Sequence, residues 1–245
     1  MLDGTGTSCN VKVSAAKGAQ HIRNEKLSAG TISPDWLETY TAVISDSLDA
    51  IGLTGQAFSP RIRPLDDGLM MCGRARTAFY MEVAHIENPN DPYGLEIDFI
   101  DSLKPGEVAI MACGGSRRIA PWGGLLSTAS QARGAAGCIT DGFIRDIKHI
   151  RELQLPVFHG GIAPLDSKGR GKLVAIDVPV LCDGVRIETG DIIVGDADGA
   201  VVVPQRVEEQ ILAMALDKVR NETSSVDDLK AGAYLRDVFN KYKVL

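Results

Sequence analysis

Residues 137–150 read GCITDGFIRDIKHI, an apolar run that ends in a turn and is followed by a charge pair. The turn contains Asp141 and Gly142, and two apolar residues separate it from Arg145 and Asp146. An apolar run bounded by a turn is typical of a buried strand. Charged residues just beyond such a strand are often part of a functional site, so this stretch directs the search for one.

The segments on either side predict alternating strands and helices. Residues 69–83 (LMMCGRARTAFYMEV) and 106–114 (GEVAIMACG) have the pattern of strands, and the small-residue segment 123–137 (GGLLSTASQARGAAG) predicts a helix. Residues 173–203 consist mostly of short β-rich runs separated by Gly or Asp-Gly turns. An alternating middle followed by a β-rich part predicts a mixed α/β sandwich instead of a pure βαβ barrel.

The two ends of the chain differ in character. Residues 1–33 are rich in Gly, Ser, Thr, Lys and Asn without a period, which predicts an N-terminal arm. Apolar residues at helical spacing predict one amphipathic helix over 33–52, and a last helix is expected from about 207 to 221. Because no linker or repeat follows the arm, residues 34–245 are expected to form a single domain.

Composition excludes several classes of protein. With 245 residues, 44% hydrophobic and 24% charged, the chain can bury a sizeable core. A net charge of −6 argues against nucleic acid and anionic membranes as partners. The five cysteines are odd in number and lack metal-ligand spacing, which disfavours a disulfide framework or structural zinc. Because neither a signal peptide nor a membrane span is recognisable, we expect a cytoplasmic protein.

The Arg145–Asp146 pair has two interpretations. It could be a surface ion pair, with Asp146 in the first turn of a helix through 147–153. Alternatively it belongs to a site together with Gly123 and Gly124, whose backbone N–H groups begin a helix and attract carboxylates. Such amides and a guanidinium could hold a 2-oxo acid, and a single aspartate is a credible Mg²⁺ ligand. The residues alone leave both interpretations open.

Two histidines lie near the pair in sequence, and either could donate a proton to a reaction intermediate. His149 is three residues beyond Asp146, so we expect it on the following helix without a catalytic role. His159 stands beside glycines at the end of a strand. We therefore favour His159 as the wall of a site.

Three stretches of the sequence resemble the RraA-like family, named for a regulator of ribonuclease E activity. They are WGGLLSTASQARGAAGCITDGFIRD (122–146), LPVFHGGIAP (155–164) and GDIIVGDADGAVVVP (190–204). The likeness covers about residues 35–235, and the fixed interval between the Gly-rich loop and the Arg-Asp pair is its most specific part. The family also contains class II 4-hydroxy-4-methyl-2-oxoglutarate and 4-carboxy-4-hydroxy-2-oxoadipate aldolases. The resemblance implies a compact α/β/β/α sandwich that assembles as a homotrimer or hexamer with sites at subunit interfaces.

The resemblance also implies roles for individual residues. Arg145 would bind the substrate, and Asp146 would hold a divalent metal, Mg²⁺ or Mn²⁺, directly or through its waters. A catalytic glutamate would come from the C-terminal helix of a neighbouring subunit, and Glu222 is the best match. The residues whose backbone would bind the 2-oxo acid are Gly123, Gly124, Leu125 and Leu126.

One departure from the aldolase pattern affects the expected chemistry. The aldolases carry an aspartate at the position of Gly124, whereas the regulator branch carries glycine. Aldol cleavage needs a base for the hydroxyl proton, but decarboxylation of oxaloacetate does not, because loss of carbon dioxide yields the enolate directly. We therefore expect a metal-dependent carbon–carbon lyase that decarboxylates or cleaves a small 2-oxo acid through a pyruvate-type enolate. The alternative is a non-catalytic, protein-binding regulator of ribonuclease E.

Overall fold

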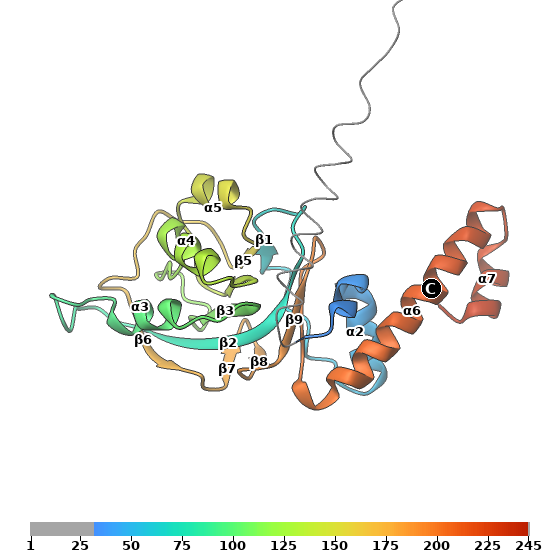
Figure 1. Cartoon of the computed structure of the whole chain (residues 1–245), viewed down its shortest axis with the longest axis horizontal. Helices are drawn as coiled ribbons and strands as arrows, with labels where there is room; N and C mark the ends of the chain where they lie inside the picture. Colours follow the sequence, from blue (N-terminus) through green and yellow to red (C-terminus); the bar gives the residue numbers. More distant parts are fainter. Residues whose placement is uncertain (1–31, 245) are drawn as a thin grey trace, which may run out of the picture.

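A curved, nearly closed sheet of eight strands runs through the computed structural model, which describes residues 32–244 (Figure 1). Its order is β1-β5-β4-β3-β2-β9-β10, and β6 also pairs with β2. β2, β3, β4 and β5 are mutually parallel, while the remaining strands join antiparallel. The strands are β1 (Arg63–Pro64), β2 (Met71–Glu82), β3 (Glu107–Ala112), β4 (Gly137–Thr140), β5 (Val157–His159), β6 (Gly171–Ile176), β9 (Ile192–Gly195) and β10 (Ala200–Val203). A separate antiparallel hairpin consists of β7 (Val180–Cys182) and β8 (Val185–Ile187).

Helices cover the sheet on two sides and define three apolar clusters. α3, α4 and α5 pack with the central strands around residues such as Phe99. The β7–β8 hairpin packs with the inner side of the sheet around Phe158, and α2 and α6 pack on β9 and β10 around Trp36. This arrangement confirms the predicted mixed α/β sandwich. The helices are η1 (Pro34–Glu38), α2 (Thr41–Ala50), α3 (Gly94–Asp101), α4 (Gly124–Ala132), α5 (Ile147–Leu153), η2 (Gln205–Val207), α6 (Glu208–Lys230) and α7 (Leu235–Tyr242).

The parallel strands determine where a site can lie. All four residues of β4 are buried, as are Ile110 and Met111 of β3, which is typical of parallel strands covered on both faces. Because β3, β4 and β5 run in the same direction, their carboxyl ends meet at one edge of the sheet. The loops that follow these strands carry the Gly-rich segment and the Arg-Asp pair, so the fold brings the two together.

The predicted single helix over 33–52 is wrong. A 3₁₀ turn, η1, ends before Thr39, and α2 begins anew at Thr41. The break has a physical cause, because the backbone N–H and Oγ1 of Thr41 donate to the Asp196 carboxylate at 2.8 and 2.7 Å. Asp196 lies in the β9–β10 turn, so a residue distant in sequence caps the helix.

The C-terminal helix is longer than its apolar pattern predicted. α6 continues beyond residue 221 to Lys230, and α7 folds back against it. The added turns are polar and carry no apolar period, but Lys241 and Tyr242 of α7 both reach the carboxylate of Asp228, at 2.8 and 2.9 Å. Polar contacts between the two helices therefore support turns that periodicity did not indicate.

Two further expectations concern the N-terminal arm and membrane-spanning helices. The predicted N-terminal arm, residues 1–33, lies outside the described residues except for its last two positions. Among the helices within 32–244, none has a stretch of apolar residues long enough to cross a bilayer.

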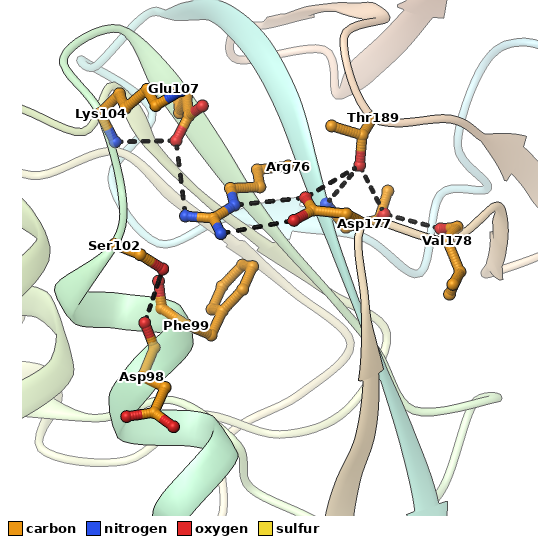
Figure 2. Close-up of polar contacts among 10 residues, drawn as sticks. Arg76, Asp98, Phe99, Ser102, Lys104, Glu107, Asp177, Val178 and Thr189 are labelled. Atoms are coloured by element: carbon orange, nitrogen blue, oxygen red, sulfur yellow. Dashed lines mark hydrogen bonds and ion pairs between the residues drawn. The ribbon is translucent and has the colours of Figure 1, made fainter.

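A buried arginine connects four parts of the fold (Figure 2). The Nε and Nη2 atoms of Arg76, on β2, lie 3.3 and 3.4 Å from the two carboxylate oxygens of Asp177, which follows β6. Nη1 faces Glu107 at the start of β3, at 4.0 Å. The guanidinium also lies 5.2 Å from the ring centroid of Phe99 on α3. The network therefore fixes the sheet at the amino end of β3, opposite the edge that carries the site.

Replacing Arg76 by alanine is expected to lower the free energy of unfolding by about 2 kcal/mol, because it removes the cation that faces the carboxylates of Asp177 and Glu107. The matched control is Arg186→Ala: Arg186 pairs with Glu188 at 2.9 Å, but both side chains are more than half exposed. That change is expected to cost less than about 0.5 kcal/mol. Urea unfolding measures both variants, and equal losses would contradict a special role for the Arg76 network.

Candidate active site

The segment that carries the Arg-Asp pair is held between two other backbone segments. Ile144 forms parallel bridges with Trp122 and Ile162, and its N–H donates to Gly161 O at 3.0 Å. The N–H of Arg145 donates to Trp122 O at 3.1 Å. These bonds extend the parallel pairing beyond the end of β4 and bring residues 145 and 146 next to the start of α4.

A buried carboxylate directs this segment. Asp141, only 2% exposed, accepts the N–H groups of Cys113 at 2.6 Å, Gly115 at 2.7 Å and Asp183 at 3.2 Å. Three charge-assisted hydrogen bonds satisfy the buried carboxylate and join the loops after β3, β4 and β7. Asp141, which the sequence indicated only as part of a tight turn, therefore also fixes the backbone that leads to Arg145 and Asp146.

Asp146 directs its side chain back to the start of α4 and not into its own helix. Its backbone is left-handed (φ 59°, ψ 38°), a conformation that aspartate tolerates better than most residues. Its Oδ2 accepts the N–H of Gly124 at 3.0 Å, and its side chain makes no capping bond to α5. The carboxylate therefore lies at the positive end of α4.

Two glycines permit this close approach. A β-carbon at Gly123 would lie 2.9 Å from Asp146 Oδ2 and 3.1 Å from Arg145 Cγ. A β-carbon at Gly124 would lie 3.2 Å from Cδ2 of His149 and 3.3 Å from Asp146 Cβ. A side chain at 123 would press on the Asp146 carboxylate and on the stem of Arg145, so close packing favours glycine there, although the extended backbone of Gly123 (φ −160°) is open to any residue.

The guanidinium of Arg145 lies near the Asp146 carboxylate, but its Nη1 faces Asp166 and Leu165 O. Its Nη1 lies 3.6 Å from Asp166 Oδ2 and 3.2 Å from Leu165 O, while its Nε is 4.0 Å from Asp146 Oδ2. Burial acts to raise the pKa of Asp166, but hydrogen bonds from Tyr93 and the backbone and the charge of Arg145 outweigh it and lower that pKa. An anionic ligand that binds Arg145 would therefore compete with an ionised Asp166.

An open pocket joins the start of α4 to the start of α5. It brings together three of the residues predicted for the site, Gly124, Leu125 and Asp146, whereas Leu126 packs against the core. The N–H groups of Leu125 and Leu126 are in the first turn of α4, where no acceptor exists within the helix. The residues that line the pocket are Gly124, Leu125, Asp146, Ile147, Lys148, His149 and Glu152.

Glu222 lies elsewhere in the same chain. It is on α6, which projects beyond β9 and away from α4 and α5 (Figure 1), and it accepts a hydrogen bond from the Tyr40 hydroxyl. Burial, followed by this bond, raises the pKa of Tyr40. The role expected for Glu222 concerns a neighbouring subunit, so it stays a prediction.

His149 lines the pocket and His159 does not, although the sequence favoured His159. His149 is on α5 as expected, and its Nε2 lies 3.0 Å from Thr128 Oγ1 on α4. His159 ends β5 and is not among the pocket residues; burial, followed by the charge of Arg151, lowers its pKa. The signal that would have found His149 is its spacing of three residues from Asp146, which places both at the start of one helix.

A more enclosed cavity of about 290 Å³ lies between residues 83–96 and 167–173. Its buried carboxyl, Glu96, accepts the Tyr80 hydroxyl at 2.7 Å and the Ser167 hydroxyl at 3.3 Å. Burial raises the pKa of Glu96 in spite of these bonds. Gly124, Leu125 and Asp146 line the open pocket and not this cavity, so we assign the candidate site to the open pocket. Arg145 lines neither of the two and lies on the far side of the Gly123 bend, toward Asp166.

Comparison with known proteins agrees with the fold. Residues 41–202 match the RraA-like family, described as Aldolase/RraA, and the chain belongs to this family. A Halalkalibacterium halodurans protein provisionally named 4-hydroxy-4-methyl-2-oxoglutarate aldolase is 34% identical over 205 residues, which are 82% of this chain and 91% of that protein. The 4-hydroxy-4-methyl-2-oxoglutarate aldolase of Thermus thermophilus is 29% identical over 133 residues, 54% of this chain and 79% of the relative.

Solved structures give the same family. An uncharacterised protein from Pseudomonas syringae pv. tomato has a TM-score of 0.74 at 27% identity and covers 83% of this chain and 94% of its own. Streptomyces coelicolor RraAS2, described as an unusual member of the RNase ES inhibitor RraA protein family, has a TM-score of 0.68 at 30% identity. The match covers 77% of this chain and 91% of RraAS2. The family thus includes relatives named as aldolases and relatives named as ribonuclease inhibitors.

Gly123→Ala is expected to separate the two segments, because the new methyl group would contact the Asp146 carboxylate. The Gly124 amide would then lose its acceptor and exchange its hydrogen with solvent at least about tenfold faster, as expected for loss of a hydrogen bond of about 1.4 kcal/mol. Amide exchange followed by NMR measures this. Gly55→Ala is the control, because a β-carbon at Gly55 meets nothing within 4 Å. Unchanged exchange at Gly124 in the Gly123 variant would contradict the packing argument.

Proposed function

We propose that this chain is a divalent-metal-dependent carbon–carbon lyase that acts on a 2-oxo acid through a pyruvate-type enolate. The observation that carries the proposal is the contact between the first turn of α4 and the Asp146 carboxylate in one pocket, with the Arg145 guanidinium 4.0 Å from that carboxylate. Together they provide dipoles and charges that favour an anion with developing negative charge.

The chemistry of Asp146 suits a hydrated hard cation. Its side chain is 52% exposed and lines the pocket, and only Oδ2 accepts a bond from Gly124. Within residues 32–244, no group of three potential metal ligands occurs. Mg²⁺ commonly uses one or two carboxylates and keeps several waters, so one aspartate is sufficient for such an ion, and Mn²⁺ takes similar ligands. When bound, the ion would supply positive charge that favours the enolate.

The protein's own groups would orient the substrate. The free N–H groups in the first turn of α4, those of Leu125 and Leu126, would receive the carboxylate of the 2-oxo acid. Arg145 would add a charge-assisted bond from its side of the bend, in exchange for part of its contact with Asp166. These contacts would align the carbon–carbon bond beside the 2-oxo group with the pocket mouth, where the released fragment can leave.

The names of the relatives and the residue at position 124 limit the range of 2-oxo acids that we propose as substrates. Names of relatives support 4-hydroxy-4-methyl-2-oxoglutarate as one substrate. Gly124 supplies no acid–base group, which favours decarboxylation of oxaloacetate, since that reaction requires no base. We propose that both reactions pass through the same enolate, and that assembly as a homotrimer or hexamer brings Glu222 of a neighbouring subunit to the site.

A second function is supported by a specific comparison. RraAS2, an RNase ES inhibitor family member, shares 30% identity and most of its fold with this chain. A regulator of this kind would bind a ribonuclease through its outer surface and would not need the pocket. Gly124 is compatible with that function.

Asp146→Ala is expected to lower the rate of oxaloacetate decarboxylation, and of 4-hydroxy-4-methyl-2-oxoglutarate cleavage, by roughly 100-fold or more. Arg145→Ala is expected to have a similar effect, and chelation with EDTA should abolish activity until Mg²⁺ or Mn²⁺ is restored. Arg133→Ala is the control, because Arg133 forms an exposed ion pair with Asp101 at the other end of α4. Equal rates in all variants and after chelation would refute the lyase.

The regulator is tested by affinity capture with a purified ribonuclease of the E type. If the chain is a lyase alone, the expected result is no retention of ribonuclease above the level of an unrelated acidic protein. Stable capture that Asp146→Ala leaves unchanged, together with the absence of lyase activity, would favour the regulator.

A further inference from the structure

The imidazole of His149 occupies the space beside Gly124. Its Cδ2 and Cγ would lie 3.2 and 3.3 Å from a β-carbon at position 124, and it lines the same pocket as Gly124 and Asp146. The absence of a side chain at 124 is therefore what makes room for this ring. The result is a titratable group at the start of α4, where the neighbouring glycines provide none.

Hydrogen bonds assign the tautomer of the ring. The Oγ1 of Thr128 donates its single proton to Gly124 O at 2.8 Å. Thr128 Oγ1 is also 3.0 Å from His149 Nε2, and because its proton is used, it must accept there. The neutral ring then carries its hydrogen on Nε2. Nδ1 is left as the unprotonated nitrogen, and it has no hydrogen-bond partner among residues 32–244.

The other charged groups of the pocket are less suited to accept a proton. Asp146 shares its carboxylate with the Gly124 N–H and is the residue proposed for the metal. The Lys148 amine is a hydrogen-bond donor, and Glu152 is one helical turn beyond His149. His149 combines a ring that lies beside Gly124 and contacts Thr128 through Nε2 with an Nδ1 that has no partner among residues 32–244.

We propose that His149 is the proton-transfer residue for aldol cleavage of a 4-hydroxy-2-oxo acid in this pocket. This inference rests on the lyase function proposed above. In the first step Nδ1 removes the proton of the C4 hydroxyl, and the electron pair of that O–H bond forms the new C=O bond. The C3–C4 bond breaks, and its electron pair passes to C3 as the enolate.

In the second step the imidazolium returns the proton from Nδ1 to C3 of the enolate. The products are pyruvate, or a substituted 2-oxo acid, and the carbonyl compound formed from C4. No oxidant or reductant takes part, and His149 ends in its starting state. Oxaloacetate has no hydroxyl proton to lose, so its C3–C4 bond can break without His149.

The difference between the two substrates provides the test. His149→Gln retains an amide that can contact Thr128 but cannot accept a proton as imidazole does. It is expected to lower kcat/KM for 4-hydroxy-4-methyl-2-oxoglutarate by about 100-fold and that for oxaloacetate by less than about threefold. The matched control, His85→Gln, changes a histidine on the wall of the separate cavity and should alter neither reaction.

A side-chain exchange tests the position independently. Gly124→Asp in the His149→Ala background places a carboxylate in the space that the ring leaves. The double variant is expected to have a kcat/KM for 4-hydroxy-4-methyl-2-oxoglutarate about tenfold or more above that of His149→Ala. Gly124→Asp alone should not improve on the wild type, because the ring then obstructs the new side chain.

Several outcomes would overturn the proposal. Equal losses in both reactions for His149→Gln would show that the residue only maintains the pocket. Loss of cleavage in Glu152→Gln, with His149→Gln active, would assign the base to Glu152. A wild-type protein that decarboxylates oxaloacetate but never cleaves the hydroxy acid would refute the proton-transfer role of His149 without contradicting the proposed lyase function. A wild-type protein without either activity would instead refute the proposed function.

Discussion

The candidate site depends on one close contact, the hydrogen bond from the Gly124 N–H to the carboxylate of Asp146. It joins two segments that the chain separates by 22 residues, and a β-carbon at position 123 would lie 2.9 Å from the same carboxylate oxygen. The buried Asp141 carboxylate makes the contact possible, because its three amide bonds fix the course of the chain toward Arg145. Loss of either carboxylate would therefore disturb the pocket more than its own hydrogen bonds suggest.

The sheet supplies the rigid frame for this contact. Its parallel strands place all the site-bearing loops at one edge, while the Arg76 network fixes the opposite end of the sheet (Figure 2). The site is therefore built from loops, but each loop begins at a buried strand, β3 or β4, and ends at a helix, α4 or α5, that packs on the sheet. Such an arrangement lets the residues at the pocket, Gly124 and His149 among them, determine the chemistry while the strands determine the fold.

The sequence predicted the fold class, because strand periods and their order are local signals. The meeting of the Gly-rich segment with the Arg-Asp pair was one of two interpretations of the residues, and the resemblance to the RraA-like family favoured it. The sequence did not predict the break before Thr41 or the contact of His149 with Gly124. The first depends on Asp196, 155 residues away, and the second on the packing of α4 against α5. Contacts between distant residues leave no periodic pattern, so only the three-dimensional structure shows them.

The central claim is that Asp146 and the first turn of α4 form one anion- and metal-binding pocket. The most direct measurement is a crystal structure of the protein soaked with pyruvate and Mn²⁺, with anomalous scattering used to locate the metal. We expect Mn²⁺ beside the Asp146 carboxylate and the pyruvate carboxylate at the N–H groups of Leu125 and Leu126. Manganese bound elsewhere, or pyruvate that leaves this pocket empty at saturating concentration, would contradict the account.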